Sequence, residues 1–156
     1  MSCAREVIKR ALRHGVVITT AESCTGGQIS AALTDIAGSS AAFTHGYVTY
    51  SNAAKVEMLG ITQATLDEFG AVSEEIAHEM AAGARVKSDA QIAIAVTGIA
   101  GPGGSEHKPE GRVCFGIGLA HMTHTETRDF GHLGRQKVRQ ATVAQDLKLI
   151  LEHLAP

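Results

Sequence analysis

The sequence predicts an α/β protein, a three-layer α/β/α sandwich on a mixed, mostly parallel sheet. Helical and strand patterns alternate along the 156 residues, and a single hairpin pattern comes late in the chain. Within the strand predicted at 91–96, residues 92–96 form a continuous apolar run, which is typical of a strand covered on both faces. No linker, repeat or low-complexity tract divides the chain, so we treat residues 1–156 as one domain.

The first third of the chain predicts two helices and two strands. A charged helix over residues 2–13 ends at Gly15, and a β-branched strand covers residues 16–20. A second helix follows the glycine pair at 26–27, and residues 43–50 alternate like a strand.

Three helices are then predicted, followed by the rest of the sheet. A loop over residues 98–111 leads from the apolar strand into two strands that pair as a hairpin, and a last helix covers residues 135–154. The expected N-caps of the three helices are Ser51 or Asn52, Thr62 and Ser73.

Composition excludes several classes of protein. A net charge of −2 and a pI of about 6.4 argue against a nucleic-acid-binding surface, and no apolar run is long enough for a membrane span. The N-terminus lacks the apolar segment of a signal peptide. Three cysteines without a C-x-x-C pair suit free thiols in a reducing compartment. We therefore expect a cytoplasmic protein with no nucleic-acid or membrane partner.

Ser23 is the candidate nucleophile, because it lies where a predicted strand turns into a helix. The first N–H groups of a helix have no internal partner, so they could hold the oxyanion that forms when a hydroxyl attacks a carbonyl. Gly26 and Gly27 would let the backbone approach a substrate closely. Simple helix capping by Ser23 and Thr25 is the structural alternative.

Lys55 is the best candidate base for Ser23. It lies in the first turn of a predicted helix, where the helix dipole and partial burial would both lower the pKa of its amine. A neutral lysine can accept the serine proton. Tyr50 could hydrogen-bond to either group or orient the substrate. The structural alternatives are that Lys55 is a solvent-exposed lysine on its helix and that Tyr50 is a core residue.

Cys24 and the histidines are the alternatives to this pair. Cys24 could be the nucleophile, since a helix N-terminus lowers a thiol pKa, but we rank it below Ser23 for want of a histidine partner. His45 and His132 lie nearest to predicted strand ends, yet neither forms a triad pattern, and no carboxylate pattern completes a metal site. We expect no metal and no cofactor.

Further candidates follow other strands. In open α/β sheets ligands gather at the carboxyl ends of strands, so Thr97 and its glycines could share a pocket with Ser23. That segment reads either as a phosphate-binding loop or as a surface connection. Arg135 and Arg139 open the last helix, and Arg139 could alternatively pair with a neighbouring acid.

Five motifs follow one another along nearly the whole chain. They are AESCTGG at 21–27, GSS at 38–40, VTYSNAAK at 48–55, GAVSE at 70–74 and TGIAGPGG at 97–104. Together they resemble the CinA C-terminal domain family, the bacterial nicotinamide mononucleotide deamidases. The chain resembles the standalone form without the family's molybdopterin-binding-like N-terminal domain.

The resemblance implies hydrolysis of the carboxamide of nicotinamide mononucleotide by a Ser/Lys dyad, with Ser23 as nucleophile and Lys55 as base. It implies a small-molecule nucleotide substrate and a homodimer or higher homo-oligomer. Tyr50 and Thr97 match positions associated with the family's active site, and Arg139 matches an arginine that could bind the substrate phosphate. From geometry rather than from the resemblance, we expect backbone groups of the Cys24–Gly27 turn and of the Gly98–Gly104 loop to contact the oxyanion and the phosphate. The substrate-binding residues expected there are Thr25, Gly26, Gly27, Gly98 and Gly101.

The chain departs from the family pattern after the glycine-rich loop. The family typically reads Lys-Pro-Val-Gly-Thr-Val, whereas this chain has Glu110 and Arg112 in place of the valine and threonine. Thr142 also replaces a frequent alanine. The alternative function is a non-catalytic nucleotide-binding or regulatory module linked to competence or DNA damage, which would use the same loops without turnover.

Overall fold

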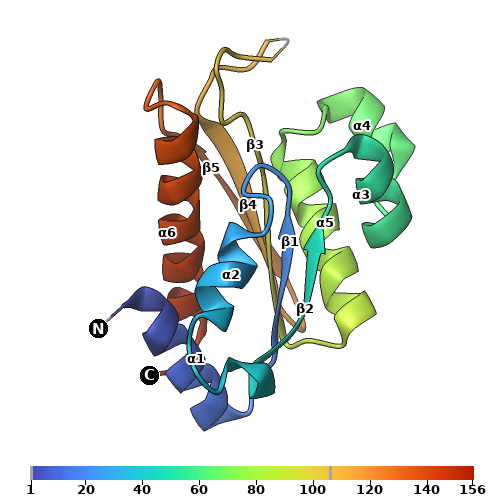
Figure 1. Ribbon diagram of the computed structural model, residues 1–156. Coiled ribbons are helices and arrows are strands. Elements are labelled where there is room, and N and C mark those ends of the chain that lie inside the picture. Colours follow the sequence, from blue (N-terminus) through green and yellow to red (C-terminus); the bar gives the residue numbers. More distant parts are fainter. Residues whose placement is uncertain (1, 106) are drawn as a thin grey trace.

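The computed structural model describes residues 2–105 and 107–156. Its centre is one five-stranded sheet in the order β2-β1-β3-β4-β5, seen edge-on in Figure 1. The strands are β1 (Ile18–Glu22), β2 (Phe43–Val48), β3 (Ile92–Gly98), β4 (Arg112–Gly118) and β5 (Thr123–Asp129).

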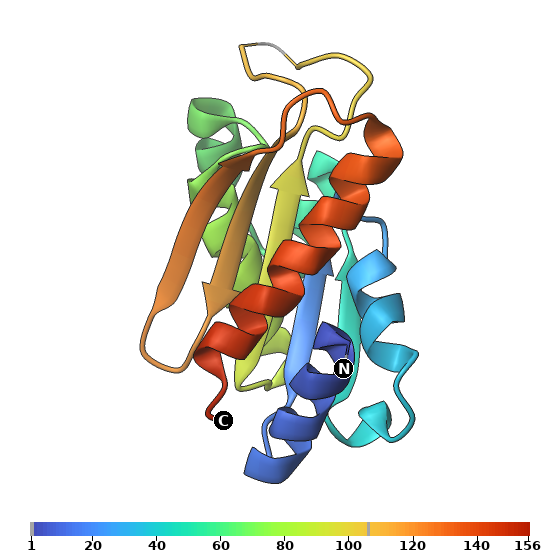
Figure 2. The same cartoon turned by 90° about the vertical axis from the view of Figure 1, so that its left-hand side faces the viewer.

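Helices cover both faces of this sheet, which confirms the three-layer sandwich. One layer holds α1 (Cys3–His14), α2 (Gln28–Thr34) and α6 (Arg135–His153), which contact one another (Figure 2). The other layer holds α3 (Asn52–Leu59), α4 (Gln63–Phe69) and α5 (Glu74–Ser88), with α5 lying across the sheet (Figure 1). A short 3₁₀ turn, η1 (Ser39–Ala41), precedes β2.

The strand directions decide where the loops meet. β1 is parallel to both β2 and β3, while β4 is antiparallel to β3 and to β5. Four of the five strands therefore point the same way, as predicted, and the sheet is mixed. The carboxyl ends of β2, β1 and β3 lie side by side at one edge.

The core is built from small aliphatic side chains. Residues 92–97 of β3 are all buried, as the apolar run predicted. One apolar cluster fills the space under α1, α2 and α6, and a second lies under α5. Helix α5 lies so close to β4 that a Cβ on Gly116 would stand 2.5 Å from the Ala77 carbonyl oxygen. In the described residues, no helix is both long and apolar enough to cross a membrane.

The ends of the elements show which local signals were read correctly. Ser51, Thr62 and Ser73 cap their helices through side-chain oxygens, as predicted. The first strand begins two residues later than expected, because the Val16 N–H donates to the Ala11 carbonyl beyond the left-handed Gly15. The second strand ends at Val48, which leaves Tyr50 on the following turn.

Candidate active site

Ser23 directly follows β1, at the centre of the edge where three strands end. Its N–H donates to the Val96 carbonyl of β3, and its own carbonyl accepts from the Gly26 N–H, closing a tight turn. Its side chain is held among its neighbours, with only 8% of the residue exposed. The turn therefore presents a fixed hydroxyl at the carboxyl end of the sheet.

Lys55 reaches this hydroxyl from α3. Its Nζ lies 3.0 Å from Ser23 Oγ and donates to the Thr49 carbonyl at 3.1 Å, and the residue is 2% exposed. Burial lowers the pKa of the Lys55 amine below its ordinary value. A neutral amine in this place has a lone pair for the serine proton. The reading of Lys55 as a solvated helix lysine is wrong.

Cys24 lies next to Ser23 but has the opposite electrostatic setting from the one expected. The sequence suggested that the helix N-terminus lowers its pKa, whereas burial raises the pKa of the thiol to about 12. The thiol therefore stays protonated at neutral pH. Its side chain points toward the end of β3, where a Cβ on Gly98 would stand 3.1 Å from Cys24 Sγ.

Glu22 is a site residue that the sequence analysis missed. It is fully buried at the end of β1, and its carboxylate accepts four hydrogen bonds of 2.6 to 3.0 Å. The donors are the Thr25 hydroxyl, the Ile29 N–H, and both the N–H and the hydroxyl of Ser30. One carboxylate thus caps α2 and ties the nucleophile turn to it.

The Glu22 cap limits where an oxyanion could bind. The N–H groups at the start of α2 are already bonded, two of them to Glu22, so they are closed to a substrate. Among the described residues, the N–H groups of Cys24, Thr25 and Gly27 in the preceding turn have no hydrogen-bond acceptor. Of the two positions that the sequence suggested, the first turn of the helix and the backbone of the Cys24–Gly27 turn, only the second keeps such N–H groups, while the Thr25 hydroxyl donates to Glu22.

Arg139 contacts the nucleophile turn. Its Nε donates to the Cys24 carbonyl and its Nη2 to the Thr25 carbonyl, both at 3.1 Å. The Cys24 carbonyl and the Thr25 N–H belong to one trans peptide unit and point in opposite directions, so the Thr25 N–H faces away from Arg139. Arg139 thus binds the backbone of the nucleophile turn, and its contact with a substrate phosphate stays a prediction.

Thr97, near the end of β3, and Lys108, in the loop that follows β3, both contact the loop between α4 and α5. Thr97 is buried, and its hydroxyl donates to the Ala71 carbonyl at 2.7 Å, which fixes the loop between α4 and α5. Lys108 fixes that loop as well, through the carbonyls of Phe69 and Val72. A pocket of about 600 Å³ lies beside these loops, lined in part by Asn52, Ile99 and Lys108 and not by Ser23.

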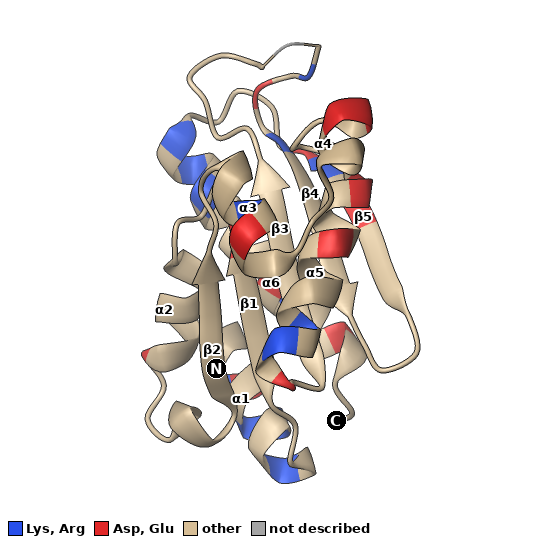
Figure 3. Cartoon of the chain, turned by 90° about the vertical axis from the view of Figure 1, so that its right-hand side faces the viewer, with Lys and Arg blue, Asp and Glu red and all other residues tan. Residues whose placement is uncertain are grey.

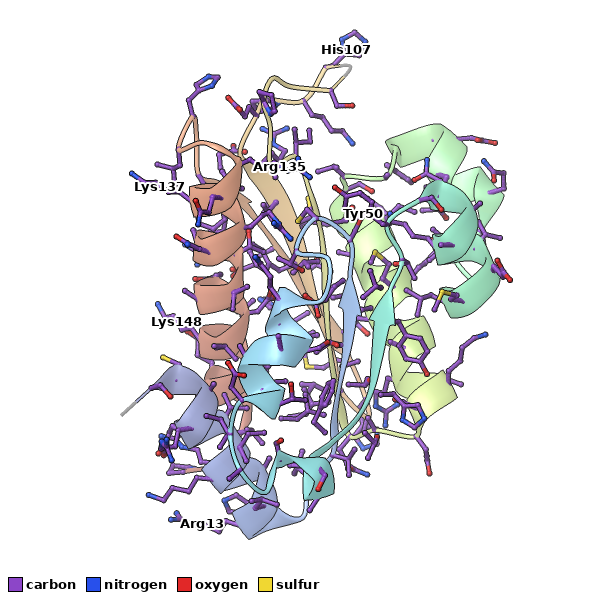
Figure 4. All side chains as sticks on the ribbon, viewed as in Figure 1. Arg13, Tyr50, His107, Arg135, Lys137 and Lys148 are labelled. Atoms are coloured by element: carbon purple, nitrogen blue, oxygen red, sulfur yellow. The ribbon has the colours of Figure 1, made fainter. Side chains whose placement is uncertain are left out.

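Tyr50 lies at the outer rim rather than in the core. It is 60% exposed, and its hydroxyl accepts a hydrogen bond of 2.6 Å from Arg135. Arg135 donates a second bond of 2.7 Å to the Gly101 carbonyl of the glycine-rich loop. Figure 4 shows the Arg135 and Tyr50 side chains at the same end of the molecule. The expected bond from Tyr50 to Ser23 or Lys55 is not among the contacts of the described residues.

The histidines near the site have other partners, as the absence of a triad pattern predicted. His45 stacks on Tyr47 along β2. His132 pairs with Glu110, one of the residues that depart from the family pattern, and Glu110 also accepts from the Gly103 N–H. The other, Arg112, pairs with Asp129 on the neighbouring strand. Glu110 thus ties the glycine-rich loop to the segment before α6.

The fold and this geometry define a class of site. A buried serine and a buried lysine meet at the carboxyl edge of an α/β/α sandwich, beside backbone N–H groups without acceptors. Such an arrangement can support nucleophilic attack on a carbonyl carbon without a histidine. The fold and the site thus define a candidate hydrolase.

Comparison with known proteins places the chain in a family. The family model of the CinA C-terminal domain matches residues 1–154. The chain therefore belongs to the CinA C-terminal domain family.

Two relatives carry a more specific name, nicotinamide-nucleotide amidohydrolase PncC. The protein from Enterobacter agglomerans is 60% identical over 101 residues, which span 64% of this chain and 62% of that relative. The protein from Escherichia coli is 46% identical over 147 residues, covering 93% of this chain and 89% of the relative.

Solved structures agree with the fold. The crystal structure of a competence/damage-inducible protein from Agrobacterium tumefaciens has a TM-score of 0.90 at 43% identity, covering 97% of this chain and 96% of that chain. A CinA superfamily protein from Escherichia coli has a TM-score of 0.94 at 33% identity, covering 97% and 88%. The α/β fold inferred from the sequence is thereby confirmed.

Proposed function

We propose that this protein hydrolyses the carboxamide of nicotinamide mononucleotide to nicotinate mononucleotide and ammonia, with Ser23 and Lys55 as a catalytic dyad. The observation that carries the proposal is the 3.0 Å contact between Ser23 Oγ and Lys55 Nζ, two side chains that are both buried. The names of the relatives support the choice of substrate.

In the first half of the reaction, Ser23 Oγ attacks the carboxamide carbon while its proton moves to the neutral Lys55 amine. A C–O bond forms, and the carbonyl oxygen takes the negative charge. The N–H groups of Cys24, Thr25 and Gly27 are the donors in reach of that charge, because the Glu22 and Arg139 contacts hold their turn in place.

In the second half, the protonated Lys55 gives its proton to the departing nitrogen, the C–N bond breaks and ammonia leaves. Water then attacks the acyl ester on Ser23, Lys55 accepts a proton from that water, and the proton returns to Ser23 Oγ as nicotinate mononucleotide leaves. The Thr49 carbonyl accepts an N–H from Lys55 and keeps the amine aimed at Ser23.

The direct test is an ammonia-release assay on nicotinamide mononucleotide. The protein should release ammonia, and Ser23→Ala should lower kcat by roughly a thousandfold or more while the variant remains folded. Retained release in Ser23→Ala with loss in Cys24→Ala would transfer the nucleophile to Cys24. Tight binding of the nucleotide with no ammonia release would instead favour the non-catalytic nucleotide-binding module.

A further inference from the structure

Arg135 joins two loops that follow different strands. Its guanidinium donates to the Tyr50 hydroxyl, two residues beyond β2, and to the Gly101 carbonyl, three residues beyond β3. In the sheet, β1 lies between these two strands, which are therefore about 10 Å apart. A guanidinium that contacts both loops must pass over the end of β1, where Ser23 begins the turn.

The contacts of Arg139 independently place Arg135 over the turn that begins at Ser23. It lies four residues after Arg135 on α6, so the two side chains share a face of the helix. Because Arg139 contacts the carbonyls of Cys24 and Thr25, Arg135 stands about 6 Å further out along the helix axis, over the same turn. Arg135 thus lies across the mouth of the candidate active site.

The charge of Arg135 is not compensated there. Both of its acceptors are neutral oxygens, and the described residues form no ion pair with it. The first turn of α6 contains no acidic residue. Basic residues gather at this end of α6, whereas acidic residues lie over α4 and α5 (Figure 3). An anion near Arg135 would meet a cation whose two acceptors are both uncharged.

We propose that Arg135 selects substrates that carry a phosphate, by exchanging its bonds to Tyr50 and Gly101 for bonds to the phosphate oxygens. The exchange opens the mouth above Ser23 and replaces two bonds to neutral oxygens with a bidentate contact between opposite charges. This role rests on the proposed function. It gives Arg135 the phosphate contact for which the sequence had suggested Arg139.

The surroundings of Arg135 let the side chain move while its backbone stays in place. The residue is exposed, so its guanidinium can rotate into solvent. The segment before α6 is held to the glycine-rich loop by the Phe130 N–H, which donates to the Gly111 carbonyl, and by the contact of His132 with Glu110. Substrate binding therefore requires a change in one side chain and no loop opening.

The test compares nicotinamide mononucleotide with nicotinamide riboside, which has the same carboxamide and no phosphate. Arg135→Met keeps the length of the side chain and removes its charge. We expect kcat/KM for the mononucleotide to fall roughly ten- to hundredfold, mainly through KM, and kcat/KM for the riboside to change less than about threefold. Arg135→Lys should restore part of the loss.

Lys137 provides the matched control. It belongs to the same helical turn and carries the same charge, but it points away from Tyr50 (Figure 4). Lys137→Met should leave kcat/KM for both substrates within about twofold. An equal loss for both substrates in Arg135→Met would overturn the proposal, and so would an equal loss for the mononucleotide in Lys137→Met, since the effect would then be one of net charge.

Failure of this proposal can be told from failure of the proposed reaction. If the wild-type protein releases no ammonia, calorimetric titration with nicotinamide mononucleotide still measures the contact. Weaker binding to Arg135→Met than to the wild type would then support the role of Arg135 while the proposed reaction fails. Equal affinity would overturn the role of Arg135 whether or not ammonia is released.

Discussion

Arg139 and Arg135 stand one turn apart on α6, yet their guanidiniums have different surroundings. Arg139 is partly buried and bonded to two carbonyls of the nucleophile turn. Arg135 is exposed and bonded to a tyrosine hydroxyl and a loop carbonyl from two other segments. Removing the first would disturb the turn itself, whereas removing the second would leave the turn unchanged.

The same difference separates two regions of the candidate site. The floor, made of Glu22, Ser23, Lys55 and Arg139, is mostly buried, and its polar atoms are held by backbone groups and by one another. The rim, made of Tyr50, Gly101 and Arg135, is held by side-chain contacts between loops. Changes in the floor should therefore alter the rate for every substrate, and changes in the rim should alter the choice of substrate.

After Ser23→Ala, the largest effect is expected from Lys55→Met in the floor. Loss of the base should lower kcat roughly a hundred- to ten-thousandfold for both the mononucleotide and the riboside. Because burial lowers the pKa of Lys55, charging this amine costs stability in the folded state, and the melting temperature at neutral pH should stay equal or rise. Ammonia release and thermal unfolding measure the two effects.

If Lys55→Met lowers the melting temperature as well as the rate, unfolding could account for the lost rate. In that case Lys55→Arg, which keeps the charge but cannot act as a base at neutral pH, is the deciding variant. Near-wild-type turnover in a folded Lys55→Arg protein would exclude Lys55 as the base.

The pH dependence of the wild-type rate should report the same lysine. Only the neutral amine accepts the Ser23 proton, so kcat/KM should rise up to tenfold per pH unit until Lys55 is deprotonated. Since burial lowers its pKa, the midpoint should lie below about 10.4, the ordinary lysine value. A rate that falls as the pH rises from about 6 to 9 would contradict a lysine base.

The sequence predicted the positions of Ser23 and Lys55 better than the contacts that support them. Strand and cap signals placed Ser23 after one strand and Lys55 in a capped helix, and these short-range patterns sufficed to bring together residues 32 positions apart. The role of Glu22 could not be read in the same way. A carboxylate beside a nucleophile has many possible donors, and only the folded turn decides that they are Thr25, Ile29 and Ser30.

The rim was predicted least well, because its contacts join segments far apart in the chain. Tyr50 and Arg135 are 85 residues apart, and no periodic pattern relates an exposed tyrosine to an exposed arginine. The buried face of α6 includes the apolar Leu147 and Ile150 but also Thr142 and Asp146. Burial of an acidic residue runs against hydrophobic patterning, so the sequence could not predict it.

A smaller effect than that of Lys55 is expected from Glu22→Gln. The amide can still accept from Thr25 and Ile29 but presents N–H groups to the donors of Ser30. The loss of charge-assisted bonds should lower the free energy of unfolding by about 2–3 kcal/mol. As the turn loosens, kcat should fall about tenfold with KM nearly unchanged, for both substrates.

The outcome for Glu22 tests the division between floor and rim directly. If Glu22→Gln instead raised KM for the mononucleotide alone, this buried carboxylate would act on substrate choice, and the separation of the two regions would fail. Steady-state kinetics with both substrates, paired with urea unfolding of the same preparation, distinguishes these results.

Asp146 should have the smallest effect on activity. Like Glu22 it is fully buried, but both of its carboxylate oxygens lack a hydrogen-bond partner in the described residues. Burial raises the pKa of Asp146 well above its ordinary value, and the charges of Glu22 and Glu126 act in the same direction. The folded protein therefore keeps Asp146 protonated at pH values where the unfolded chain has lost the proton.

The raised pKa of Asp146 predicts how the free energy of unfolding depends on pH. Below about pH 4 both states hold the proton and Asp146 costs nothing, whereas at higher pH the wild-type protein loses up to about 1.4 kcal/mol of unfolding free energy per pH unit until the folded carboxyl ionises. Asp146→Asn removes this cost. Its gain over the wild type in urea unfolding should be larger at pH 8 than at pH 5, with kcat within about twofold. A gain that is equal at both pH values would mean that Asp146 is already ionised in the folded protein. The carboxylate would then need a hydrogen-bond donor inside the protein, as Glu22 has.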